Sequence, residues 1–201
     1  MTGTQPAGRP RDPVVDQRIA EAAIGLFGEQ GWAGFSVEAV ARRAGVGKAS
    51  IYLRWPTKQA LLLEALRRHV QGVAEVEASD VRDELVQLGM QLMRHYLGEA
   101  GRAALRISVE ADHIPGVAEH WATIRESRVL AARAIVRRAI DRGELSDATS
   151  VTLLLDTLCG AVMNHVQATP EAARAKLLPA GESYVVRLVD FLLPRTPVPG
   201  R

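Results

Sequence analysis

Basic, hydroxyl-bearing and small residues are concentrated between Ser36 and Lys58, and these residue types contact nucleic acid. Lysine and arginine side chains neutralise phosphates, and serine hydroxyls and helix N-terminal amides donate hydrogen bonds to them. An alanine methyl group can contact a thymine methyl, and a lysine can pair with guanine acceptors in the major groove. The stretch therefore predicts a DNA-binding surface. Its candidate contact residues are Ser36, Arg43, Gly47, Lys48, Ala49, Ser50, Tyr52, Arg54 and Lys58.

Two short helices are expected to present these side chains. Ser36 suits the cap of the first helix, which has small apolar residues on one face and ends at Gly45. The second helix is expected to run from Lys48 to Arg54 and to stop ahead of Pro56, because a residue that precedes proline avoids the helical region. Two helices joined by a tight glycine-containing turn form a helix-turn-helix, which places its second helix in the major groove.

The same stretch resembles the signature of the TetR family of transcriptional regulators. The match reads SVEAVARRAGVGKASIYLRWPTK at residues 36–58, followed by Leu61-Leu62 and preceded by Ala22-Ala23-x-x-Leu26-Phe27-x-x-x-Gly31. The resemblance covers residues 13–66 and implies a ligand-responsive transcriptional regulator. In our interpretation it is a repressor that binds a palindromic operator as a homodimer and is released by a small-molecule effector. An activator or an architectural DNA-binding protein with the same DNA-binding head is the alternative.

The resemblance also implies roles for the matching positions. Ser36 and Lys58 would bind phosphates, and Tyr52 would pack its ring on the sugar–phosphate backbone. Lys48 would contact a phosphate or a guanine, while Ala49 would approach the base edges.

Several of these residues also have purely structural explanations. Ser36 would cap a helix in any protein, and Tyr52 alone suits a half-buried core position. Arg43, with Arg42 beside it, could form a solvated helix face. Leu53 departs from the family pattern, since many relatives carry a polar or aromatic residue there, and it removes one potential contact.

The periodicity of apolar residues predicts an all-α protein, because no alternating strand pattern of any length occurs. Arg9 and Arg11 could enter the minor groove as an arm or belong to a disordered segment. The expected parts are a flexible arm at residues 1–12, a three-helix helix-turn-helix DNA-binding domain at residues 13–58, a larger C-terminal helical bundle for dimerisation and ligand binding at residues 59–193, and a proline-rich disordered tail at residues 194–201.

Two apolar helices in the C-terminal part predict a homodimer. One is expected to start at Ser146 or Asp147 and is apolar nearly all the way round, and the other is expected near residues 182–193. A helix of this kind is buried on more than one side. We therefore expect a four-helix interface with two helices from each subunit, as the family resemblance also implies; a core helix within one chain is the alternative. The interface candidates are Leu154, Leu155, Leu158, Val162, Val185, Leu188, Val189 and Leu192.

In relatives the C-terminal bundle encloses a small-molecule pocket, and the mostly apolar composition of this region favours a hydrophobic effector. Each polar candidate also has an ordinary explanation in surface exposure, a core hydrogen bond or a loop. The ligand-binding candidates are Tyr96, Arg106, Glu110, His113, Trp121, Asn164 and His165.

Composition argues against other classes of protein. The net charge is +2, so a case for DNA binding rests on where the basic residues lie rather than on their number. The single Cys159 fits a reducing compartment and an inert position in an apolar helix. The sequence has no metal-ligand spacing, no glycine-rich phosphate loop and no run near the roughly 18 apolar residues of a membrane span. We expect a cytoplasmic protein that is not an enzyme and has no cofactor, metal or membrane partner.

Overall fold

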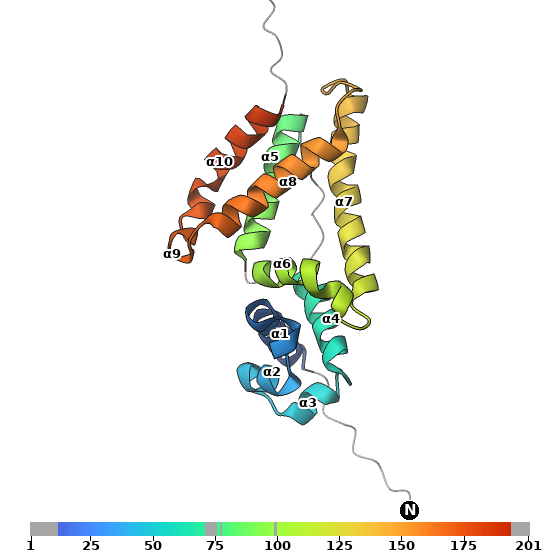
Figure 1. The fold of residues 1–201 in the computed structure, drawn as a ribbon, viewed down its shortest axis with the longest axis vertical. Helices are drawn as coiled ribbons and strands as arrows, with labels where there is room; N and C mark the ends of the chain where they lie inside the picture. The colour runs from blue at the N-terminus through green and yellow to red at the C-terminus, as the bar shows by residue number, and fades with distance from the viewer. Residues whose placement is uncertain (1–11, 71–75, 77, 99, 194–201) are drawn as a thin grey trace, which may run out of the picture.

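The computed structural model describes residues 12–70, 76, 78–98 and 100–193. Arg9, Arg11 and the predicted tail lie outside the described residues. Within these ranges every regular element is a helix, as the periodicity predicts. Figure 1 shows helices α1 to α3 gathered at one end as a small head, with α4 and α6 next to it and a larger helical body beyond.

Helix α1 of the head begins at a clear N-cap. Asp12 accepts a hydrogen bond from the Val14 N–H at 3.0 Å, and Pro13 occupies the first helical position, where a missing N–H costs nothing. Gly31 has a φ of 66° and breaks α1, and one further turn follows to Gly34. The helices are α1 (Pro13–Gly34), α2 (Val37–Ala44), α3 (Lys48–Tyr52) and α4 (Lys58–His69).

The body packs α5 against both α8 and α10, with α7 on the other side of α5 and α8. Its helices are α5 (Val81–Leu97), α6 (Gly101–Glu110), the 3-10 turn η1 (Ala111–His113), α7 (Ala118–Asp141), α8 (Val151–Ala168), α9 (Glu171–Arg174) and α10 (Leu177–Leu192). The Glu84 carboxylate on α5 is 1% exposed and accepts hydrogen bonds from Arg138 at 2.9 Å and Arg142 at 2.7 Å. This paired charge joins α5 to the C-terminal end of α7.

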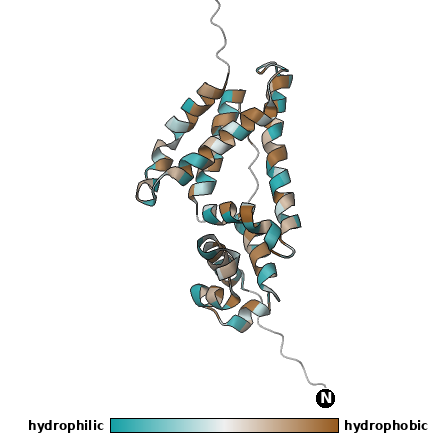
Figure 2. Ribbon diagram, viewed as in Figure 1, coloured by the Kyte–Doolittle hydropathy of each residue, from teal (hydrophilic) through white to brown (hydrophobic). Residues whose placement is uncertain are grey.

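Two apolar cores lie along the molecule, and Figure 2 shows the apolar and polar residues alternating along most helices. One core joins α1–α4 to α6 and to Trp121 of α7, and the other fills the space between α5, α7, α8 and α10. Leu61, Leu62 and Leu66 of α4 are completely buried in the same core as Phe27 of α1. The packing of the head therefore continues past residue 58, where the sequence predicts its end.

Two helices of the body begin at other residues than the sequence predicts. Ser150 caps α8 by accepting a hydrogen bond from the Leu153 N–H at 3.3 Å, while Ser146 and Asp147 lie in the preceding turn. Helix α10 begins at Leu177, ahead of the predicted start near residue 182. Pro179 falls in its first turn, where proline is tolerated. The short helix α9 is not predicted at all.

Candidate nucleic-acid interface and internal cavity

The turn between α2 and α3 has the geometry of a helix-turn-helix. The Ser36 hydroxyl accepts a hydrogen bond from the Ala39 N–H at 3.2 Å and thereby caps α2, as the sequence predicts. Gly45 ends α2 in the left-handed conformation, with φ 64° and ψ 39°. Ile51 on α3 is completely buried and anchors this short helix to the head. The turn and this anchor fix which face of α3 meets solvent.

That outer face carries four of the nine predicted contact residues. Gly47, Lys48 and Ala49 are exposed, and the Tyr52 side chain is 44% exposed. Leu53 is 81% exposed, one residue beyond α3. An exposed side chain of this size at the end of α3 suits contact with a thymine methyl or a sugar. The sequence interpretation treats Leu53 as a lost contact, although its spacing of four residues from Ala49 could have placed both on one face.

Lys48 contacts two neighbouring side chains of the head. Its ammonium group forms an ion pair with Glu38 of α2, and it lies 5.6 Å from the centroid of the Tyr52 ring. The hydrogen bond from Lys48 lowers the pKa of the Glu38 carboxyl and raises the pKa of Lys48. Both side chains are about half exposed, so a phosphate can replace Glu38 at small cost.

Arg54 and Ser50 are more enclosed than the sequence predicts. The Arg54 guanidinium forms an ion pair with Asp16 of α1, and both side chains are only 15% exposed. Arg54 also donates to the Ser50 hydroxyl and to the Ser50 carbonyl, each at 2.9 Å. These contacts join α3 to α1, so in this structure Arg54 holds α3 in position.

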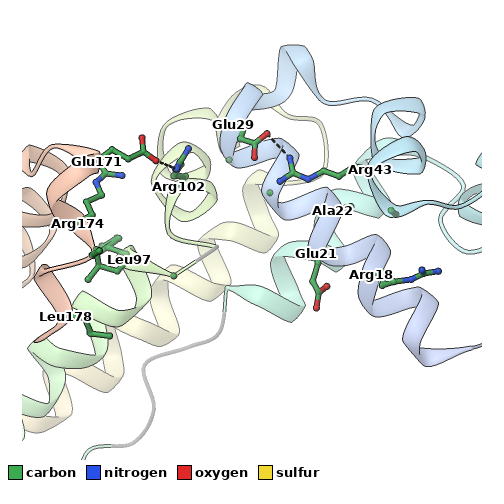
Figure 3. Close-up of a pocket in the computed structure, with 16 residues that line it drawn as sticks. Arg18, Glu21, Ala22, Glu29, Arg43, Leu97, Arg102, Glu171, Arg174 and Leu178 are labelled. Carbon is green, nitrogen blue, oxygen red and sulfur yellow. Dashed lines mark hydrogen bonds and ion pairs between the residues drawn. The ribbon is translucent and has the colours of Figure 1, made fainter.

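Lys58 and Arg43 also contact protein groups. The Lys58 ammonium lies 3.7 Å from the centroid of the Trp32 ring and 3.4 Å from the Phe35 carbonyl oxygen. This cation–π contact holds the start of α4 against the end of α1. Arg43 points toward Glu29 of α1 and pairs with it at 2.7 Å, as Figure 3 shows.

Arg43 lies at the edge of a cleft of about 790 Å³ between the head and the body. Figure 3 shows two ion pairs between helices in the cleft wall: Arg43 with Glu29, and Arg102 of α6 with Glu171 of α9 at 2.8 Å. Because both arginines and glutamates line the cleft, it carries charges of both signs.

A second, smaller pocket of about 320 Å³ lies in the body and opens to solvent, because lining residues such as Val129 and Thr152 are exposed. Helices α5, α6, α7 and α8 form its walls, and most of its lining is apolar. Tyr96 and Trp121, both predicted ligand contacts, line it. The remaining polar groups come mainly from α7, whose arginines the sequence interpretation did not single out.

The other predicted ligand contacts lie elsewhere. Arg106 donates to the carbonyls of Gly28 at 2.9 Å and Glu29 at 3.0 Å, and Glu110 accepts from the Trp32 N–H at 2.7 Å. Both side chains therefore tie α6 to the end of α1. Of the other three, His113 is exposed in η1, Asn164 is exposed on α8, and His165 stacks on the Tyr184 ring at 3.9 Å between centroids.

Most of the predicted dimer contacts belong to the core of a single chain. Leu158, Val162, Val185 and Val189 are completely buried, and Leu154 and Leu155 are at most 8% exposed. Leu188 and Leu192 are partly buried against the same core. All-round hydrophobicity does not tell which side of a helix faces its own chain. The large apolar residues that α8 and α10 leave exposed are Leu153 at 68%, Leu178 at 45% and Phe191 at 82%.

Comparisons with known proteins agree with this architecture. Residues 19–65 match the family described as bacterial regulatory proteins, tetR family, and residues 76–192 match the tetracyclin repressor-like C-terminal domain. An uncharacterized HTH-type transcriptional regulator of Mycobacterium tuberculosis is 31% identical, over 78% of this chain and 80% of that protein. The regulator AqdR of Rhodococcus erythropolis is 30% identical, over 75% of this chain and 73% of AqdR.

Solved structures have the same fold. The TetR family regulator PfmR from Thermus thermophilus superposes with a TM-score of 0.66 at 22% identity, covering 91% of this chain and 97% of PfmR. Among the described residues, no helix is long and apolar enough to cross a membrane. The helix-turn-helix head, the helical body and the two family matches together establish that the chain belongs to the TetR family of transcriptional regulators.

Proposed function

We propose that the chain is a cytoplasmic, homodimeric repressor that binds a palindromic operator through α3 of each subunit and is released by a small-molecule effector. The exposed outer face of α3 is the observation that carries this proposal. Gly47, Lys48, Ala49, Tyr52 and Leu53 share it, while Ile51 anchors the opposite side in the core.

The contacts of α3 divide into two kinds. Lys48 exchanges Glu38 for a phosphate, and Tyr52 lies beside it to pack on the backbone. Ala49 and Leu53 offer apolar surface to the base edges, where a thymine methyl is the complementary group. Ser36 adds a helix N-terminus to which a phosphate can bind. Arg54, Lys58 and Arg43 hold the head together through Asp16, Trp32 and Glu29 and contribute to DNA binding by positioning α3.

The exposed faces of α8 and α10 support a homodimer. Leu153 and Phe191 are large apolar side chains that a monomer leaves in water. Helices α8 and α10 pack against each other, and the Tyr184 hydroxyl donates to the Ala161 carbonyl between them at 3.3 Å. A second copy would cover this face symmetrically and place two copies of α3 about one DNA turn apart, roughly 34 Å.

The pocket in the body supports an effector. Its volume of about 320 Å³ falls within the usual range for ligand sites. Its wall includes α6, which also contacts α1 of the head, so a ligand there adjoins the helix that links body and head. An effector that binds two arrangements of α6 unequally would change the operator affinity.

Selection of random duplex DNA by the purified protein tests the proposal. We expect a palindromic motif, and we expect Lys48→Ala to weaken binding while lowering the slope of log affinity against log salt by about one per subunit. Lys176→Ala, which removes an exposed lysine of the body, is the matched control and should leave the slope unchanged.

Failure of a folded sample to enrich any motif would contradict DNA binding, and an asymmetric motif would contradict the symmetric dimer. A reporter gene that becomes more active when the protein is removed would support repression. A less active reporter would instead identify an activator.

A further inference from the structure

One face of α7 supplies nearly all of the charge in the pocket of the body. Trp121, Arg125, Val129 and Arg133 line it at intervals of four residues along one helix face, and Arg128 lies three residues after Arg125. The only acidic side chain in the lining is Asp156 of α8. The lining therefore holds three guanidinium groups and one carboxylate. Since α7 rises 1.5 Å per residue, this face extends over roughly 18 Å between Trp121 and Arg133.

The other ionisable groups around the cavity are neutral near pH 7. Burial raises the pKa of the Cys159 thiol to about 11 and also raises the pKa of the Tyr96 hydroxyl. His95 lies beside Arg128, with 3.4 Å between its Nε2 and the Arg128 guanidinium, and burial lowers its pKa to about 4. These groups do not offset the positive charge of the arginines.

Arg133 has donor capacity that the protein does not use. One of its terminal nitrogens donates to the Thr152 hydroxyl at 2.9 Å, whereas its buried Nε has no acceptor in the part of the chain that the structure describes. At the other end of the same face, the Trp121 Nε1 is also buried without an acceptor. A pocket with an unused donor at each end of this face, guanidinium groups along the face and apolar side chains on its other walls complements a ligand with acceptor oxygens and an apolar body.

We propose that the effector is an anionic amphiphile, with an acid group bound by Arg133 beside Thr152 and an apolar body that packs against the apolar side chains of α5 and α8. Leu88, Leu92, Leu155 and Met163 provide the apolar wall opposite the arginine face. This inference rests on the proposed function, because that proposal assigns the cavity to the effector.

Calorimetric titration of the full chain with three amphiphiles of equal length tests the ligand class. The probes are decanoate, decanol and decyltrimethylammonium, each below its micelle concentration. We expect decanoate to bind at least ten-fold more tightly than decanol and the cation to bind most weakly. Equal or tighter binding of decanol or of the cation would overturn the proposal, and so would an absence of binding by all three.

Variants locate the acid group. Arg133→Gln should bring decanoate to the affinity of decanol while leaving decanol binding unchanged. Arg137→Gln is the matched control, since Arg137 lies on the same helix, is exposed, and does not line the cavity. If Arg133→Gln keeps the preference for decanoate, the acid group does not bind there and the proposal is wrong.

Operator binding is measured separately, so that the two proposals fail in distinguishable ways. Titration without DNA reports only on the cavity and its ligand class. A palindromic operator that is bound equally tightly with and without decanoate would refute release by this ligand but not its binding. Absence of DNA binding would refute the regulatory function while the calorimetric result stands.

Discussion

Gly45 and Gly47 flank the turn between α2 and α3 but meet different requirements. Gly45 has φ 64° and caps α2, whereas Gly47 has φ −70° and precedes α3 in extended conformation. A Cβ atom added at either position would meet nothing within 4 Å. Any difference between the two substitutions therefore comes from the backbone conformation alone.

We expect Gly45→Ala to lower the free energy of unfolding by about 1–2 kcal/mol, because the left-handed region is unfavourable for alanine. Gly47→Ala should leave stability unchanged or raise it by a few tenths of a kcal/mol, since its conformation suits any residue. Urea denaturation of both variants measures the difference. Equal losses would show that the turn is not held in the left-handed conformation.

His95 makes stability depend on pH. Burial, and then the charge of Arg128, lower its pKa to about 4 in the folded chain, from an ordinary value near 6.5. The unfolded chain therefore binds more protons between these two values, and stability rises with pH across that window.

We expect the free energy of unfolding to fall by about 1–2 kcal/mol between pH 7.5 and pH 5, with the partial exposure of the ring already discounted. His95→Gln should remove this part of the dependence, whereas His113→Gln, at an exposed position, should not. Denaturation curves at the two pH values test it; an unaltered slope in His95→Gln would assign the dependence to other groups.

At the residue scale, local roles are easier to predict than tertiary ones. Ser36 acts as a cap and Gly45 adopts a left-handed turn as expected, because each requirement involves only neighbouring residues. Arg54 pairs with Asp16, 38 positions earlier, and Lys58 with Trp32. No pattern in the sequence indicates which basic residue of the head has such a distant partner.

At the scale of elements, helix α6 connects the cavity to the head. Its residues Ala104, Leu105 and Ser108 line the cavity, and Arg106 and Glu110 bind the end of α1. The approach is close at Gly31, where an added Cβ atom would lie 2.6 Å from the Glu110 carboxylate. Gly31 thus meets two demands, a positive φ and room for a carboxylate.

We expect Glu110→Ala to reduce the effect of effector on operator affinity, because it frees the Trp32 N–H and loosens α6 from α1. The ratio of operator affinity without effector to that with effector should fall about two- to ten-fold. The free energy of unfolding should fall by about 1–2 kcal/mol. Glu119→Ala, at an exposed position of α7, is the control. Operator titrations with and without effector measure both variants; full coupling in Glu110→Ala would mean that another contact carries it.

The sequence predicts that most of the helices exist, but it predicts their first residues less reliably. Strong local signals, such as Ser36 ahead of α2, give correct helix starts. The start of α8 is wrong by several residues because Ser146 and Ser150 are both suitable caps, and only tertiary packing selects Ser150. The resemblance predicts a pocket in the body, but most of its lining could not be predicted, since it depends on how α5, α7 and α8 lie relative to one another.

At the scale of the whole molecule, the apolar composition of α8 and α10 predicts that both helices are buried. It does not predict whether their own chain or a second copy buries them. Leu158 and Val185 are buried by their own chain, which leaves Leu153 and Phe191 for a second copy. The two groups of residues therefore predict opposite outcomes when a charge is introduced. A charge in the core prevents folding, because a buried charge without a partner is costly, whereas a charge on the outer face prevents only association.

We expect Leu153→Glu and Phe191→Glu to give folded monomers by sedimentation, with unchanged helical circular dichroism, and Leu158→Glu to unfold. Val109→Glu, an equally exposed apolar position on α6, is the control and should stay dimeric. Because one head makes few contacts, the monomers should bind the operator at least ten-fold more weakly although α3 is intact. A folded Leu153→Glu or Phe191→Glu variant that remains dimeric would place the interface on another face of the molecule, and the spacing of the two copies of α3 would then have to be derived from that face.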